Sequence, residues 1–177
     1  MWPIVARLAG EAIHSPSGWV ERGVRVVVMY PMNALVADQI GRLRRMIGDQ
    51  EDEFIHSFRG VAGEHSRRPQ FGMYTGRTPY AGKESSERQD RELATSLAKL
   101  LPQGDNDPYY QQLLKSGKIP AKKDLAKFID LLRRGEHYTS SDDAEMLTRF
   151  EMQATAPDIL ITNYSMLEYM LLRPRED

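Results

Sequence analysis

The chain has 177 residues, a formal net charge of −1 and no cysteine. This length allows one domain with a modest core, and the near-zero charge excludes a global electrostatic field that attracts nucleic acid. The lack of cysteine excludes disulfides and thiolate metal sites and suits a cytoplasmic protein, and no apolar run approaches the roughly 20 residues that a membrane-spanning helix needs.

The first predicted elements are a helix, a strand and a second helix. Residues 3–13 carry apolar side chains at helical spacing, and the turn-forming sequence Ser15–Gly18 ends that helix. Val24–Tyr30 is a continuous apolar run, which predicts a parallel strand that is buried on both faces. The run stops at Pro31, and an amphipathic helix starts at about Ala34.

The middle of the chain predicts one short strand and several helices. Phe71–Tyr74 is the strand, and residues 102–120 are rich in turn-forming residues. Asp142 and Asp143 favour a helix start, because acidic side chains stabilise a helix N-terminus. The predicted helices here span Ser85–Leu101, Ala121–Arg134, which Gly135 stops, and Asp142–Met152.

The C-terminal part repeats the pattern of strand, polar turn and helix. Ile159–Thr162 is a short apolar strand, and Ser165–Leu172 is a predicted helix that Pro174 halts. Because the carboxyl ends of parallel strands meet at one end of a sheet, and helix N-termini present N–H groups there, the turns predict a phosphate-binding surface. Such contacts position a nucleic-acid strand without reading its sequence. The three polar segments that follow predicted strands are Pro31–Asn33, Thr75–Gly76 and Thr162–Ser165.

Each of these turns also has a purely structural interpretation. From spacing alone, Asn33 is more simply an N-cap of the helix that follows, and Asn163 or Ser165 would cap the last helix. Tyr164 would stack on a base or fill a gap in the core, and Gly76 would be an ordinary turn glycine. The residues alone leave these alternatives open.

Other charged patterns predict no further site. The four histidines are scattered, and no pair has the spacing of metal ligands on a helix. Asp142–Glu145 superficially resembles an acidic box but lacks a preceding apolar strand, so a role at a helix N-terminus is the better interpretation. Five arginines are expected at the solvated surface: Arg42, Arg44, Arg45, Arg67 and Arg68.

The strand-end segments resemble those of the first RecA-like domain of superfamily 2 DEAD/DEAH-box helicases. Tyr30–Val36 resembles motif Ia, Thr75-Gly76 resembles the glycine turn after the next strand, and Thr162–Leu167 resembles motif Ib. The segments are similar to those of large bacterial helicases of the MrfA and Druantia DruE kind. The resemblance implies an α/β fold over residues 1–177: a partial RecA-like, three-layer domain with a parallel sheet and a helical insertion at 85–153.

The resemblance also implies a strand order and a set of contact residues. The motif Ib strand would lie between the other two strands, and the turns would hold a nucleic-acid backbone, with single-stranded DNA as the expected partner. The implied nucleic-acid-binding residues are Pro31, Asn33, Ala34, Thr75, Gly76, Thr162, Asn163 and Tyr164.

Two motifs of the helicase family are absent from the chain. It has neither G-x-x-x-x-G-K-[ST] before the first strand nor D-E-x-[DH] after the last one. We therefore expect a piece of a longer ATP-dependent DNA helicase or translocase that has no catalytic residue, cofactor or metal of its own. ATP and magnesium would belong to the longer protein, whose remaining chain would be the second partner.

Two alternatives stay open. The chain would be an independent, non-enzymatic module that binds nucleic acid or a protein partner on a helicase-like scaffold. The weaker alternative is nucleotide binding at Gly76–Glu84, which follows a strand and precedes a helix as a phosphate loop does. This loop has one residue too many between its glycines, Pro79 removes an N–H donor, and Glu84 replaces the hydroxyl that would bind magnesium.

Overall fold

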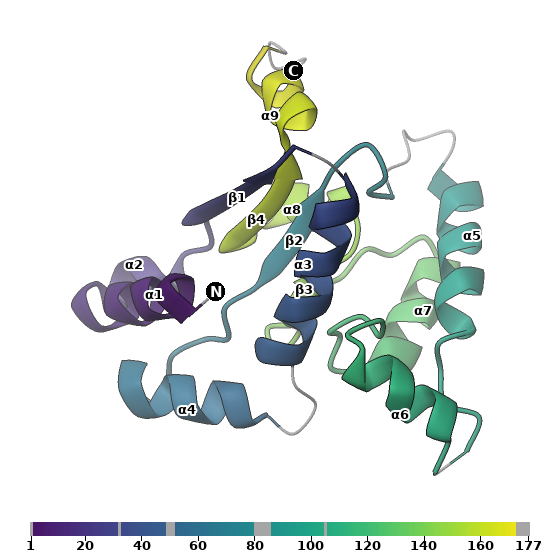
Figure 1. The fold of residues 1–177 in the computed structure, drawn as a ribbon, viewed down its shortest axis with the longest axis horizontal. Coiled ribbons are helices and arrows are strands. Elements are labelled where there is room, and N and C mark those ends of the chain that lie inside the picture. The colour runs from purple at the N-terminus through teal and green to yellow at the C-terminus, as the bar shows by residue number, and fades with distance from the viewer. Residues whose placement is uncertain (1, 32, 49–51, 80–85, 105, 173–177) are drawn as a thin grey trace.

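A parallel β-sheet with helices on both faces forms the centre of the protein (Figure 1). The computed structural model describes residues 2–31, 33–48, 52–79, 86–104 and 106–172. All strand pairs are parallel, and the strand order is β1-β4-β2-β3. The predicted α/β class and parallel sheet are thus confirmed. The strands are β1 (Val26–Tyr30), β2 (Phe71–Tyr74), β3 (Glu145–Met146) and β4 (Ile159–Asn163).

The predicted order of the three longer strands is also confirmed, because β4 lies between β1 and β2. Tyr30 in β1 pairs with Asn163 in β4, and Tyr74 in β2 pairs with Thr162. The last residues of these strands therefore lie together, and we call this side the carboxyl end of the sheet. The amino end is the opposite side, where the strands begin.

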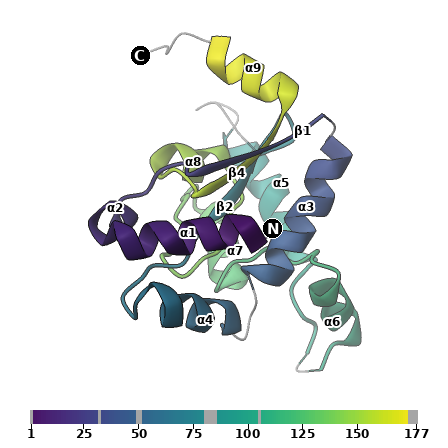
Figure 2. The ribbon, with the colours of Figure 1, turned by 60° about the vertical axis from the view of Figure 1, so that its left-hand side comes forward.

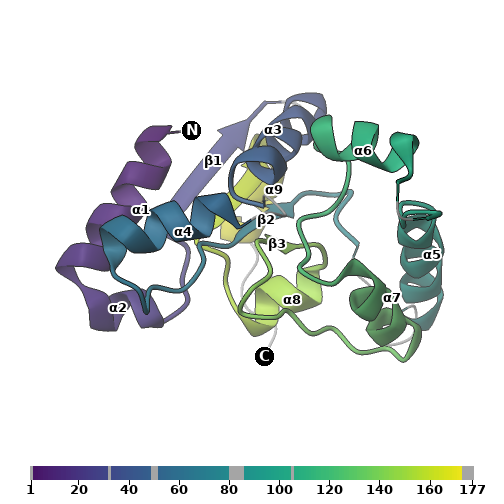
Figure 3. The ribbon, with the colours of Figure 1, turned by 90° about the horizontal axis from the view of Figure 1, so that it is seen from below.

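One face of the sheet is buried under three helices (Figures 1 and 3). Their apolar side chains recur at helical spacing, so each helix presents a continuous apolar stripe to the sheet. Leu8, Leu43 and Phe58 pack with Phe71 and Ile161 of the strands, and all five are buried. The helices are α1 (Trp2–His14), α3 (Asn33–Met46) and α4 (Glu53–Ala62), and the short α2 (Pro16–Val20) buries Trp19 beside them.

The other face is covered in part by α8 (Arg149–Ala154). A Cβ atom on Gly72 would lie 2.5 Å from Sδ of Met152, so the glycine allows α8 to pack directly on β2. Farther along the same face, Val27 and Met29 of β1 are each 48% exposed. Because of this exposure, the predicted burial on both faces of β1 is wrong. Among the described residues β1 has one neighbouring strand, so it is also an edge strand.

The range 85–153 contains a separate helical core. Its helices and the pair α1 and α2 lie at opposite sides of the molecule, with the strands between them (Figures 1 and 3). Leu97, Leu113 and Phe128 are buried within this group rather than against the sheet. The helices are α5 (Ser86–Ala98), α6 (Pro108–Lys115) and α7 (Leu125–Arg133).

The last helix, α9 (Tyr164–Leu172), projects from the carboxyl end of the sheet (Figure 2). Among its described residues none is buried, and Leu171 and Leu172 are exposed. Helix α9 therefore carries an exposed apolar surface.

Two segments differ from the prediction because side chains next to a helix start set where the helix begins. Asp142–Met152 is not one helix: β3 comes first, and α8 begins after Thr148, which forms a capping box with Glu151. Residues 108–115 form α6 instead of turns, since the Asp107 carboxylate accepts the first N–H groups of that helix. Helix α4 was not predicted, and α2 occupies the expected turn at Ser15–Gly18.

Candidate nucleic-acid interface

The carboxyl end of the sheet brings the three predicted turns together. Pro31 follows β1 and is exposed, and Asn33 and Ala34 open α3. The side chains of Asn33 and Ala34 lie outside the described part of the structure, so their contact with nucleic acid stays a prediction. The start of α3 and the start of α9 both lie at this end, because each helix directly follows its strand.

The Thr162 side chain acts inside the protein. It is fully buried, and its Oγ1 donates a hydrogen bond of 2.6 Å to the carbonyl oxygen of Tyr74. This bond joins β4 to β2 at the point where both strands end. Thr162 therefore fixes the spacing of two turns rather than presenting its hydroxyl to a ligand.

Asn163 and Tyr164 differ in what they offer to a ligand. The Asn163 Oδ1 atom accepts a hydrogen bond of 2.8 Å from the backbone N–H of Met166, so this side chain caps α9. Tyr164 is 61% exposed and does not fill a gap in the core. The aromatic ring is thus accessible for stacking, which stays a prediction.

The turn after β2 is closed by its own threonines. The backbone N–H of Thr75 donates to Oγ1 of Thr78 at 2.9 Å, and the Thr78 hydroxyl donates to the carbonyl oxygen of Met73 at 2.6 Å. The N–H of Arg77 donates to Oγ1 of Thr75 at 3.2 Å. The two threonines are buried, whereas Gly76 and Arg77 are exposed at the tip of the turn.

Gly76 is not required by the packing of the chain itself. A Cβ atom added there would meet no atom within 4 Å, and its φ angle is not positive. Within the described residues, neither the Gly76 N–H nor the Arg77 guanidinium has a hydrogen-bond or ion-pair partner. A backbone donor and a cation are therefore both available at the tip of this turn, and this is the donor set that an anion such as phosphate needs.

The described start of the loop that follows does not have the geometry of a phosphate loop. Residues 80–85, which include Lys83 and Glu84, lie outside the described part of the structure. In the described part, Thr75–Pro79 forms a hydroxyl-closed turn, and α5 begins only at Ser86. A phosphate loop instead directs successive N–H groups inward ahead of a helix, so no step of ATP chemistry is assigned to these residues.

The amino end of the sheet carries more arginines, but they are paired. Asp158 is fully buried just before β4 and accepts hydrogen bonds from Arg22, Arg25 and Arg67. The Arg67 pair is bidentate, at 2.6 and 2.7 Å. The guanidiniums of Arg25 and Arg67 lie 5.0 and 4.3 Å from the Trp19 ring centroid. Burial, followed by the charge of Arg67, lowers the pKa of Arg22 to about 10.

Several of the arginines expected at the surface are therefore structural. Arg68 is buried and pairs with Asp52, and Arg67 is held by Asp158. Arg44 forms a bidentate pair of 2.7 and 2.8 Å with Glu145. The predicted role of Asp142–Glu145 at a helix N-terminus is wrong, because Glu145 lies in β3 and this pair fastens the strand to α3.

A buried ion group joins the helical core to α8. The Glu151 carboxylate accepts hydrogen bonds from Lys122 and Thr139, and also from the backbone of Leu147 and Thr148 at 2.9 Å each. Lys122 pairs with Asp143 as well, at 3.2 Å. Every oxygen of Glu151 is thus occupied, which indicates an architectural group rather than a catalytic one.

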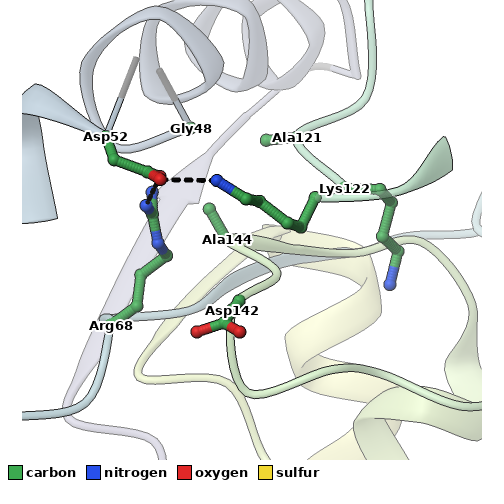
Figure 4. Close-up of a pocket in the computed structure, with 8 residues that line it drawn as sticks. Gly48, Asp52, Arg68, Ala121, Lys122, Asp142 and Ala144 are labelled. Carbon is green, nitrogen blue, oxygen red and sulfur yellow. Dashed lines mark hydrogen bonds and ion pairs between the residues drawn. The ribbon is translucent and has the colours of Figure 1, made fainter. Parts of the chain in front are cut away.

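Two hollows lie away from the carboxyl end. A polar pocket of about 270 Å³ at the amino end contains Asp52, which bridges Arg68 and Lys123 (Figure 4). The hydrogen bond from Lys123 is the main cause of the lowered pKa of Asp52. A more apolar groove of about 810 Å³ lies among α1, α3 and α4, and the exposed side chains of Trp2 and Val61 line it.

The described residues contain neither a metal-binding group nor a membrane span. Among them no cluster of three or more histidine, aspartate or glutamate side chains is placed to hold an ion. The helices that the structure describes include none that is long and apolar enough to cross a bilayer.

The chain is similar to one curated protein, the Druantia protein DruE of Escherichia coli (strain UMEA 4076-1). The two are 38% identical over 198 aligned positions, which include 99% of this chain. The chain spans only 10% of the length of that protein. No family model matches the sequence, and no solved structure matches it.

Proposed function

We propose that this chain is the part of a longer, DruE-like DNA helicase or translocase that holds the backbone of a nucleic-acid strand. The observation that carries the proposal is the turn after β2, where the Gly76 N–H and the Arg77 guanidinium are exposed without a partner among the described residues. The starts of α3 and α9 lie at the same end of the sheet and add partial positive charge.

Uncovered apolar surfaces support membership of a longer protein. Val27 and Met29 are half-exposed on an edge strand, Leu171 and Leu172 are exposed on α9, and the groove beside Trp2 has no described occupant. Soluble proteins rarely leave several such surfaces open. In the helicase family the strand with the acidic box pairs with the motif Ia strand, so the open side of β1 is where we expect that strand.

ATP hydrolysis would require residues that this chain lacks. In the longer protein a lysine loop would hold the nucleotide phosphates and an acidic box would hold magnesium, while the present residues would bind the strand along which the motor moves. With DNA and magnesium, phosphate release by the chain alone should match the buffer blank. Turnover that disappears in a Lys83→Ala variant would contradict this and favour the Gly76–Glu84 loop.

Binding of single-stranded DNA tests the proposal directly. We expect weak, salt-sensitive binding with a shallow salt dependence, because few phosphates can be neutralised. Arg77→Met should weaken binding by about tenfold, the usual scale for one charged hydrogen bond. Arg88→Met is the control, since Arg88 is also exposed but lies on α5, where it pairs with Glu92. Equal affinities of wild type and Arg77→Met in a fluorescence-anisotropy titration would contradict the proposal.

An independent module remains the second candidate. It would use the same carboxyl end for nucleic acid, or the groove among α1, α3 and α4 for a protein partner. In a longer protein, loss of Arg77 should reduce DNA-stimulated ATP turnover more than basal turnover. A reading frame that continues on both sides of the chain in the genome would favour the longer protein, and a stop codon with a promoter before Met1 would favour the independent module.

A further inference from the structure

We infer that Arg149 is a positioning residue for the nucleic-acid interface: it orients the turn after β2 so that the Gly76 N–H and the Arg77 side chain face outward. The inference rests on the proposed function and adds to it a residue that lies 72 positions after Arg77. Nothing in the sequence connects Arg149 with that turn.

Three contacts of Arg149 enclose the turn. Its guanidinium Nη2 donates a hydrogen bond of 2.8 Å to the carbonyl oxygen of Thr75, and its backbone N–H donates one of 3.0 Å to the carbonyl oxygen of Pro79. The guanidinium carbon lies 4.9 Å from the ring centroid of Tyr74. The contacts thus hold the last residue of β2, the start of the turn and its end.

The geometry of the peptide bond explains the effect on Gly76. The Thr75 carbonyl and the Gly76 N–H belong to one trans peptide unit, so they point in opposite directions. The Thr75 oxygen faces inward, because it accepts from Arg149 and from the Thr78 N–H at 3.1 Å. The Gly76 N–H must then face away from the protein, toward a ligand.

The backbone of Arg149 is fixed by the capping box at the start of α8. Arg149 is the first residue of α8, directly after Thr148, whose hydroxyl accepts the Glu151 N–H at 3.2 Å. The Glu151 carboxylate in turn accepts a hydrogen bond from the Thr148 N–H, and it forms an ion pair with Lys122. The guanidinium extends from this fixed backbone and is bonded to the Thr75 carbonyl, so it can position the turn without touching phosphate.

The salt dependence of single-stranded DNA binding distinguishes positioning from direct contact. Each phosphate contact that is lost lowers the slope of log affinity against log salt by about 0.7 for a single strand. We expect Arg149→Met to weaken binding by about tenfold with an unchanged slope, whereas Arg77→Met should lower both. Arg149→Lys, which retains one donor, should restore part of the affinity. Arg91→Met, an exposed change on α5, is the control.

Amide hydrogen exchange of the DNA-free chain provides the second readout. Arg149→Met should accelerate exchange at Arg77 and Thr78 by several-fold while amides of β4 keep their rates. Unchanged DNA affinity, a slope that falls as in Arg77→Met, or unchanged exchange at the turn would each overturn the positioning role. If wild type fails to bind DNA, the proposed function fails together with this role; if only Arg149→Met binds like wild type, the role alone is wrong.

Discussion

The two ends of the sheet contain similar basic groups and use them differently. At the amino end, Arg22, Arg25 and Arg67 converge on one buried carboxylate, Asp158, and their donors are consumed inside the protein. At the carboxyl end, Arg77 has no partner among the described residues. The number of arginines alone would favour a nucleic-acid site at the amino end, whereas their pairing leaves a cation without a described partner at the carboxyl end, where we propose the site. The proposed nucleic-acid surface is therefore marked by unpaired donors and not by total charge.

The largest expected effect is the loss of the carboxylate at the amino end. Asp158→Ala would leave three arginines without their shared partner, and breaking a buried ion pair in this way costs about 3–5 kcal/mol of unfolding free energy. Urea denaturation followed by circular dichroism measures the change. Asp38→Ala removes an exposed partner of Arg42 and should cost less than about 1 kcal/mol. Similar costs for the two variants would mean that the amino end is not the structural one.

A smaller effect is expected at Asn163 and separates capping from nucleic-acid contact. Asn163→Ala removes the acceptor for the Met166 N–H and should destabilise α9 by about 1 kcal/mol. Asn163→Asp retains that acceptor and adds a negative charge, so helix content should persist while single-stranded DNA binding falls. Circular dichroism measures helix content, and fluorescence anisotropy measures DNA binding. If Asn163→Asp binds DNA like wild type, Asn163 is only a helix cap.

The smallest effect is a pH dependence at the amino end. The pKa of Asp52 is lowered by the hydrogen bond from Lys123, so its ionised form stabilises the folded state. This contribution is fully present above the ordinary aspartate value of 3.8 and is lost as the pH falls through the lower folded value. Asn tolerates the left-handed backbone of residue 52, where φ is 59°, so Asp52→Asn is the suitable variant.

Denaturation of wild type and Asp52→Asn over a pH series measures that contribution. The stability difference between the two proteins should be constant near neutral pH and shrink in the acid range below about pH 4. A difference that grows as the pH falls would show that the ionised form of Asp52 does not stabilise the fold.

Local patterns in the sequence predicted β1, β2 and β4 but neither β3 nor the pairing of charges. β1, β2 and β4 are apolar runs that end at turns, so their existence could be read directly, and the resemblance gave their order. The break in the predicted helix at Asp142–Met152 depends on Lys122 and Thr148, one of which is distant in sequence. No short window of sequence contains both Lys122 and Asp143, whereas the capping box of Thr148 and Glu151 spans four residues and was open to prediction.

The candidate site was predictable to a similar extent. Thr75, Gly76, Thr162 and Asn163 follow strands, and the structure brings them to one end of the sheet. The sequence did not reveal that Thr162 is buried or that Arg149 bonds the Thr75 carbonyl, because both facts depend on which residues meet in three dimensions.

Amide chemical-shift mapping of the 177-residue chain during titration with single-stranded DNA compares the two ends in one experiment. We expect the signals of Gly76 and Arg77 and of the first turns of α3 and α9 to shift. The signals of Arg22, Arg25 and Arg67 should stay in place, because these side chains remain bonded to Asp158. Shifts confined to the amino end, or no shifts at any DNA concentration, would contradict the assignment of the carboxyl end as the nucleic-acid interface.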